Sequence, residues 1–263
     1  MSADRPVVKI CGIRTPEAAL AVAVAGADLI GVNFAHVSKR RVDLATARRI
    51  VETLREGGER PPAPLNLPPL AAPPLRKERS EWSPRPGAVG IFVEQSPDEI
   101  AAIAHEASLQ AVQLSGDCTP AACIAVHDAT GLPVIAVMRL GSASDVPIAM
   151  ALASSTGVVA VLVDAPGTVG GAGHAWDHAQ ARAVVDAVAS LGVGVIVAGG
   201  LHEGNVCSAL ARSGAWGVDV ASGVETAGMT NPERVRAFVR GAHMALLSRH
   251  EPATKATDNT IGT

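Results

Sequence analysis

Residues 158–163 read VVAVLV, and they give the clearest indication of the fold. Six apolar residues follow one another with no polar residue between them, which is typical of a strand buried on both faces. Such strands belong to parallel sheets whose two surfaces are covered by helices. The segment therefore predicts an α/β architecture, and similar strands are expected on both sides of it.

Short runs rich in Val, Ile and Leu do recur along the chain, and Ala-rich stretches with helical spacing separate them. Eight strands are predicted, at 7–10, 28–34, 88–93, 109–114, 133–138, 157–163, 193–198 and 216–220. Eight helices are predicted, near 15–25, 43–56, 97–107, 119–130, 144–155, 177–190, 203–213 and 232–247. This alternation predicts a single α/β domain, a closed (β/α)8 TIM barrel. A doubly wound open sheet is the alternative, but it normally has fewer parallel strands.

Several of these helices carry a clear start signal. A side chain that can cap a helix precedes a proline at Thr15-Pro16, Ser96-Pro97, Thr119-Pro120 and Asn231-Pro232. Proline is favoured at the first helical position, where its missing N–H costs nothing. These four boundaries are therefore predicted from local chemistry as well as from periodicity.

Residues 57–87 interrupt the alternation, because nine of the 18 prolines fall within them. That density is incompatible with a helix or a central strand. We expect a flexible Pro-rich insertion between the second helix and the third strand of a barrel domain spanning 1–250, followed by a disordered tail at 251–263. Helix-to-strand loops lie at the end of a barrel opposite its active site. The insertion is therefore expected to be inert, and a partner that docks on it has only composition in its favour.

Composition excludes several classes of function. The 263 residues carry a formal charge of −3, are 48% hydrophobic and contain only 2% aromatic residues. A chain this apolar folds around a large core, and an acidic chain with few aromatic residues is not suited to nucleic acid. Four dispersed cysteines and the lack of a long apolar run favour a cytoplasmic protein with neither a signal peptide nor a membrane contact. Whether it is a monomer or a homodimer stays open.

Reactive groups in such barrels lie at the C-terminal ends of the strands. Two of the predicted ends carry groups suited to acid–base chemistry, the thiol of Cys11 after the first strand and the carboxyl of Asp164 after the sixth. A cysteine in this position is more often a small buried apolar residue, and an aspartate is often a turn former. From the residues alone, both interpretations remain open.

Glycine pairs follow the seventh and eighth strands, where barrels of this kind commonly bind phosphate through backbone N–H groups. The residues predicted to do so are Gly199, Gly200, Ser222 and Gly223. The glycine-rich stretch 170–173, which includes Gly171, is a candidate third edge. No P-loop and no dinucleotide fingerprint is present, so a small phosphorylated substrate is expected rather than a nucleotide cofactor.

Metal chemistry has little support, because the nearest histidine pair, His174 and His178, lacks a third ligand in sequence. The basic run Lys39-Arg40-Arg41 is usually a solvated loop. On the catalytic face of an acidic protein, however, the planar fork of Arg40 is suited to a carboxylate.

Together these motifs resemble the phosphoribosylanthranilate isomerase family of tryptophan biosynthesis. The matching stretches are KICG at 9–12, GAD at 26–28 with GVNF at 31–34, SKR at 38–40, QLSG at 113–116, GGAG at 170–173, AGGL at 198–201 with NV at 205–206, and GVDVASGVE at 217–225. The similarity runs from about residue 7 to residue 240, interrupted by the Pro-rich stretch. It implies an intramolecular oxidoreductase that performs an Amadori rearrangement on N-(5-phosphoribosyl)anthranilate without metal or cofactor.

The resemblance also implies roles for particular residues. Asp164 would be the general acid that protonates the ribose ring oxygen, and Cys11 the general base that removes the C2′ proton. Arg40 would hold the anthranilate carboxylate, and the glycine loops, including Gly171, would hold the 5-phosphate.

The sequence departs from the family at two places. Ser115 stands where the family usually has His, and Thr230-Asn231 stand where it usually has Lys-Asp. Neither position is the acid or the base, so the reaction is expected to survive. Two alternatives stay open: a related histidine-pathway sugar-phosphate isomerase, although that type has Asp at the first strand end, and a divergent paralogue that only binds phosphorylated ligands.

Alternation along the first strand predicts one more contact. Lys9 and Cys11 share a face, so Lys9 is expected to point into the barrel and to pair with Asp219 on the adjacent eighth strand. Its positive charge is expected to help lower the pKa of Cys11 from the ordinary thiol value of about 8.5.

Overall fold

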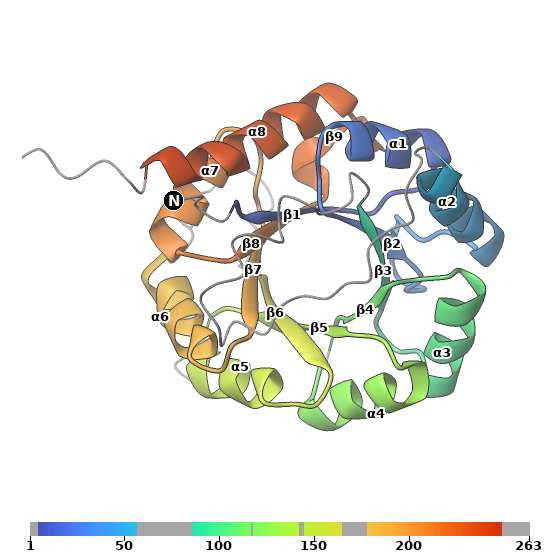
Figure 1. The fold of residues 1–263 in the computed structure, drawn as a ribbon, viewed down its shortest axis with the longest axis horizontal. Coiled ribbons are helices and arrows are strands. Elements are labelled where there is room, and N and C mark those ends of the chain that lie inside the picture. The colour runs from blue at the N-terminus through green and yellow to red at the C-terminus, as the bar shows by residue number, and fades with distance from the viewer. Residues whose placement is uncertain (1–4, 57–85, 117, 142–144, 165–177, 249–263) are drawn as a thin grey trace, which may run out of the picture.

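The computed structural model describes residues 5–56, 86–116, 118–141, 145–164 and 178–248. Within these residues, eight parallel strands follow one another around a closed barrel, and β8 pairs with β1 to complete it. Helices α1 to α8 surround the strands as an outer ring (Figure 1). The predicted (β/α)8 barrel is confirmed.

All eight predicted strands are present, within a few residues of the expected bounds. They are β1 (Val7–Cys11), β2 (Leu29–Asn33), β3 (Gly87–Phe92), β4 (Ala111–Leu114), β5 (Val134–Arg139), β6 (Val158–Asp164), β7 (Gly194–Ala198) and β8 (Gly217–Val220). The eight predicted helices are α1 (Pro16–Val24), α2 (Leu44–Glu56), α3 (Pro97–Glu106), α4 (Pro120–Thr130), α5 (Asp145–Ala153), α6 (His178–Ala189), α7 (Val206–Ser213) and α8 (Pro232–Ser248). Between β8 and α8 the chain adds a 3-10 turn, η2 (Ser222–Val224), and a hairpin of β9 (Glu225–Thr226) and β10 (Met229–Thr230), which the sequence did not predict.

The capping signals act as predicted. In each case the side chain accepts hydrogen bonds from backbone N–H groups of the first turn, at Thr15, Ser96, Thr119 and Asn231. Ser96 also forms a reciprocal capping box with Glu99. These bonds satisfy donors that have no partner within the helix, and so they fix where each helix begins.

Alternation along the strands divides the core into two apolar layers. Val8 and Ile10 face outward and pack in the large layer between strands and helices. Val7 faces inward, in a smaller cluster that fills the barrel. Because neighbours alternate, Lys9 and Cys11 point to the interior with Val7, as the sequence predicted.

The expected insertion at 57–87 lies outside the described residues except for Pro86 and Gly87, and Gly87 already begins β3. The expected tail at 251–263 lies outside them entirely. Over the described ranges, no helix combines the length and hydropathy needed to cross a bilayer.

Candidate active site

A cavity of about 280 Å³ opens at the C-terminal ends of β4 to β8. Its lining includes five of the residues predicted for the site, namely Asp164, Gly199, Gly200, Ser222 and Gly223. Cys11 and Arg40 are not part of that lining but lie next to it, on β1 and on the loop after β2. Gly171 falls outside the described residues. The structure therefore joins the predicted acid to the predicted phosphate loops, with the thiol and the guanidinium beside them.

A buried ion pair connects Cys11 to this cavity. The ammonium of Lys9 is fully buried and donates to Oδ1 of Asp219 at 2.9 Å, which confirms the predicted pair. Asp219 also lines the cavity, and Lys9 lies close enough to Cys11 to affect its ionisation. Asp219 at the cavity wall, Lys9 and Cys11 are therefore successive neighbours, and the first two affect the ionisation of the thiol.

Lys9 does act to lower the pKa of Cys11, as predicted, but a larger effect in the opposite direction decides the net shift. Burial is the largest effect and raises the pKa of the thiol to about 11. The positive charges of Lys9 and Arg40 act downward as expected, while the negative charge of Asp219 acts upward. The sequence indicated the cation but gave no measure of the desolvation that outweighs it. The thiol is therefore protonated at neutral pH.

Asp164 is the last residue of β6 and faces the same cavity. Burial, followed by the charge of Asp219, raises the pKa of its carboxyl, and Arg139 opposes the shift. Arg139 is paired with Asp164 in the β5–β6 register and lines the cavity, but the sequence analysis missed it. The predicted strand stopped at Met138, one residue too early. A carboxyl with a raised pKa is suited to act as a general acid.

Arg40 is held in place by Glu225 from the far end of the chain. Its Nε donates to Oε1 at 2.6 Å and its Nη2 to Oε2 at 2.8 Å, which is a bidentate, partly buried ion pair. The side chain lies across Gly12, where a Cβ would overlap the Cδ of Arg40. Gly12 also has a φ of 78°, so glycine is required there for both reasons. Sequence gave no signal for the partner of Arg40.

The two phosphate-loop candidates touch each other at Gly223. A Cβ there would overlap the backbone carbonyl oxygen of Leu201, and it would lie 2.9 Å from the carbonyl carbon. The loop after β8 can approach the loop after β7 this closely only because Gly223 has no side chain. The two loops therefore form a single wall of the cavity.

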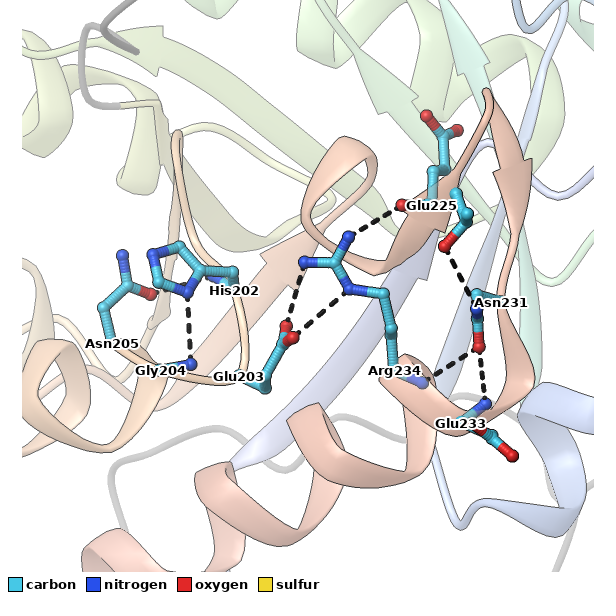
Figure 2. A network of polar contacts seen from close by, with 9 residues as sticks. His202, Glu203, Gly204, Asn205, Glu225, Asn231, Glu233 and Arg234 are labelled. Atoms are coloured by element: carbon cyan, nitrogen blue, oxygen red, sulfur yellow. Dashed lines mark hydrogen bonds and ion pairs between the residues drawn. The ribbon is translucent and has the colours of Figure 1, made fainter. Parts of the chain in front are cut away.

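A polar network links these loops to α8 (Figure 2). Arg234 on α8 donates to both carboxylate oxygens of Glu203 in the β7–α7 loop, at 3.2 and 3.3 Å. Its Nη1 donates to the backbone carbonyl of Glu225 at 2.8 Å. In the β7–α7 loop, Asn205 Nδ2 donates to the carbonyl of Gly200 at 3.0 Å. One arginine thus links the glycine loop after β7 to the segment that carries Glu225, a link the sequence did not reveal.

Ser115, which stands in place of the usual family His, also lines the cavity. It accepts a hydrogen bond from Nε2 of Gln113 at 3.2 Å. The buried Oε1 of Gln113 has no hydrogen-bond partner among the described residues. A buried acceptor without a partner is costly.

Metal binding gains no support from the described part of the chain, where no group of three His, Cys, Asp or Glu residues is placed to hold an ion. His174, one of the two histidines considered from sequence, lies outside the described residues.

Comparison with known proteins gives one consistent result. The family model described as N-(5′-phosphoribosyl)anthranilate (PRA) isomerase matches residues 75–241. The N-(5′-phosphoribosyl)anthranilate isomerase of Myxococcus xanthus is 37% identical over 238 residues, covering 89% of this chain and 95% of the relative.

Two solved structures extend this result to the fold, and each covers 90% of this chain and 98% of the neighbour. A phosphoribosyl anthranilate isomerase in complex with reduced 1-(o-carboxyphenylamino)-1-deoxyribulose 5-phosphate has a TM-score of 0.67 and 26% identity. Monomers generated from the dimeric isomerase of Thermotoga maritima have a TM-score of 0.67 and 25% identity. The Thermotoga maritima isomerase is thus a dimer from which monomers were generated.

Proposed function

The chain belongs to the N-(5′-phosphoribosyl)anthranilate isomerase family, and we propose that Cys11 and Asp164 carry out the proton transfers of its reaction. The protein is an aldose–ketose isomerase of tryptophan biosynthesis. It converts N-(5-phosphoribosyl)anthranilate to 1-(2-carboxyphenylamino)-1-deoxyribulose 5-phosphate by an Amadori rearrangement. The histidine-pathway alternative is not supported, because the relatives bear the anthranilate isomerase name.

Asp164 begins the reaction as the acid. The single observation that supports this role best is its place at the cavity wall with a raised pKa, since burial favours the protonated carboxyl. Its proton passes to the ribose ring oxygen, the C1′–O bond breaks, and the nitrogen lone pair forms a Schiff base with C1′. The carboxylate that remains is stabilised by the neighbouring Arg139.

Cys11 follows as the base. It removes the proton from C2′, and the electrons of that C–H bond move to form the enolamine, which tautomerises to the ketone. Because the pKa of the thiol is about 11, only a small fraction of the free enzyme carries the thiolate at neutral pH. The cations Lys9 and Arg40 stabilise that thiolate and so keep the fraction from being smaller still.

Arg40 binds the anthranilate carboxylate in this proposal. Glu225 occupies the Nε and Nη2 edge of the guanidinium, while Nη1 makes no hydrogen bond among the described residues. The remaining edge of the fork can thus receive a second carboxylate in the same plane. Glu225 fixes the direction in which that edge points.

The phosphate lies against the glycine loops, where backbone N–H groups of Gly199, Gly200, Ser222 and Gly223 are close to the cavity. Gly171 remains a predicted contributor. A cytoplasmic location is part of the proposal and agrees with four cysteines that form no disulfide.

Steady-state kinetics on three variants tests the catalytic assignment. Cys11→Ser and Asp164→Asn should each lower kcat by about 10²–10⁴-fold, the usual contribution of a positioned acid or base. Cys207→Ser is the matched control, because Cys207 lies on α7 away from the cavity lining, and it should keep wild-type turnover. Near-normal turnover of folded Cys11→Ser would show that the thiol is structural.

A further inference from the structure

We propose that Cys118 and Cys123 form a redox-active pair that a peroxide converts to a disulfide, and that this disulfide alters the adjacent edge of the substrate cavity. Their sulfur atoms are 3.4 Å apart, and neither cysteine is part of a disulfide. Neither takes part in the isomerase reaction. The pair lies at the start of α4, on the loop that follows β4.

The start of the helix holds the two thiols together. Thr119 is the N-cap of α4, its hydroxyl accepts from the N–H of Ala122, and Pro120 takes the first helical position. Cys118 directly precedes the cap and Cys123 is the fourth helical residue. Side chains at these two positions pack against each other across the first turn. The contact is therefore set by the capped helix start, and the pair stays together as long as α4 is folded.

The two thiols differ in exposure and in the direction of their pKa shifts, and these differences assign a separate step of the oxidation to each. Cys118 is partly exposed, whereas Cys123 is fully buried. A hydrogen bond from Cys123 and another from the backbone N–H of Val137 lower the pKa of Cys118, while the same contact raises the pKa of Cys123. Cys118 is thus the accessible thiol with thiolate character, and it is the one that reacts with the oxidant. Cys123 is the resolving thiol, which reacts with oxidised Cys118 in the second step.

The chemistry balances with a peroxide as the two-electron oxidant. The Cys118 thiolate attacks one peroxide oxygen, an S–O bond forms, the O–O bond breaks, and the leaving oxygen takes a proton to become water. The sulfur of Cys123 then attacks that of Cys118, an S–S bond forms, the S–O bond breaks, and the second water leaves with the Cys123 proton. The sulfurs must approach from 3.4 Å to about 2.05 Å. A dithiol reverses the step.

The effect on the cavity follows from the partners of Cys118. Its backbone N–H donates to the carbonyl of Gly116 at 2.9 Å, and its sulfur accepts from Val137. Gly116, Ser115 and Val137 all line the cavity. Drawing the sulfur towards Cys123 weakens its contact with Val137 and shifts the loop that carries Ser115. We expect KM to rise about threefold or more, with kcat within about twofold, because Cys11 and Asp164 lie on other strands.

Thiol titration followed by kinetics tests both halves of the proposal. The reduced enzyme is treated with hydrogen peroxide, its remaining thiols are alkylated under denaturing conditions, and the peptides are identified by mass spectrometry. In wild type and Cys207→Ser, alkylation at positions 118 and 123 should be lost together. The peptide that carries both cysteines should then be lighter by two hydrogens than its unalkylated dithiol form, and dithiothreitol should restore alkylation at both positions. Cys118→Ser and Cys123→Ala should form no disulfide, and the peroxide-induced rise in KM should be absent in both. If Cys123→Ala fails to fold, Cys118→Ser carries the comparison alone.

Three results would overturn parts of this proposal. If Cys11 or Cys207 is oxidised before Cys118, or if all thiols remain, the pair is not redox-active. If the disulfide forms and KM is unchanged, the link to the cavity is wrong. The link to KM rests on the isomerase reaction, whereas the thiol titration does not; a reduced enzyme without isomerase activity would therefore contradict the function and leave the disulfide test intact.

Discussion

Replacing Gly223 with alanine gives the sharpest test of the proposed phosphate site. The added Cβ would overlap the carbonyl oxygen of Leu201, a backbone atom that no side-chain rotation can move away. The loop after β8 and the loop after β7 must therefore separate. The change introduces no charge and removes no side chain, so its effect reports on the distance between the two loops.

The separation needed is more than about 1 Å before the Cβ reaches ordinary contact with that oxygen. A donor 2.9 Å from a phosphate oxygen would then lie about 4 Å away, beyond the range of a hydrogen bond. Hydrogen bonds to charged groups contribute about 1.5–3 kcal/mol each. Losing one of them corresponds to a rise in KM of about 10–10²-fold, since each 1.4 kcal/mol is a factor of ten. Turnover at saturation should change by less than about threefold, because Cys11 and Asp164 lie on β1 and β6.

Steady-state kinetics with inorganic phosphate as a competing ligand measures this effect directly. Gly223→Ala should raise both KM for the substrate and Ki for phosphate, while its thermal unfolding shows that it is folded. Gly204→Ala is the matched control in the β7–α7 loop, because its Cβ would meet only the imidazole of His202, at 3.1 and 3.2 Å. It should keep KM within about twofold. A folded Gly223→Ala enzyme with unchanged KM and Ki would refute the assignment of these loops to phosphate.

Three further predictions follow from the same geometry. Arg40→Ala should raise KM about tenfold or more with a smaller effect on kcat, and Arg40→Lys should restore little of it, because an ammonium lacks the bidentate fork. The pH profile of kcat/KM should be flat at neutral pH, fall on the acid side below the raised pKa of Asp164, and fall again above the Cys11 pKa of about 11. Replacing residues 58–85 by a short Gly/Ser linker should leave kcat/KM within about threefold, because α2 ends and β3 begins at the end of the barrel opposite the cavity; a folded deletion with lost activity would contradict this placement.

The sequence predicted the framework well because its signals are local. Apolar runs predicted every barrel strand, and a capping residue before a proline predicted four helix starts. The five proposed site residues that line the cavity followed from the strand ends, since a parallel barrel gathers those ends on one face. Alternation along β1 was enough to predict that Lys9 meets Asp219.

What the sequence missed depends on groups that are distant along the chain. Glu225 contacts Arg40 across 185 positions, and no periodic pattern connects them. Gly223 was predicted as a phosphate contact, but its need to be glycine comes from a backbone carbonyl of another loop. The hairpin of β9 and β10 is two residues per strand, too short to give an alternating pattern. The direction of the Cys11 pKa required the depth of burial, which only the packed barrel shows.

The protonation of the two proposed catalytic groups, Cys11 and Asp164, explains why burial is compatible with the roles proposed for them. In the proposed mechanism the reaction begins from protonated Asp164 and deprotonated Cys11, and between the two pKa values the fraction of enzyme in that state depends only on the difference between them. Burial raises both pKa values. It therefore disfavours the thiolate of Cys11 but favours the protonated carboxyl of Asp164, and the second effect partly offsets the first. The charge of Asp219 likewise raises both. Lys9 lowers the pKa of Cys11 and is not among the groups that shift the pKa of Asp164, so it narrows the difference between the two pKa values. The Lys9–Asp219 pair therefore favours the productive form of the site even though it leaves the thiol protonated in most molecules.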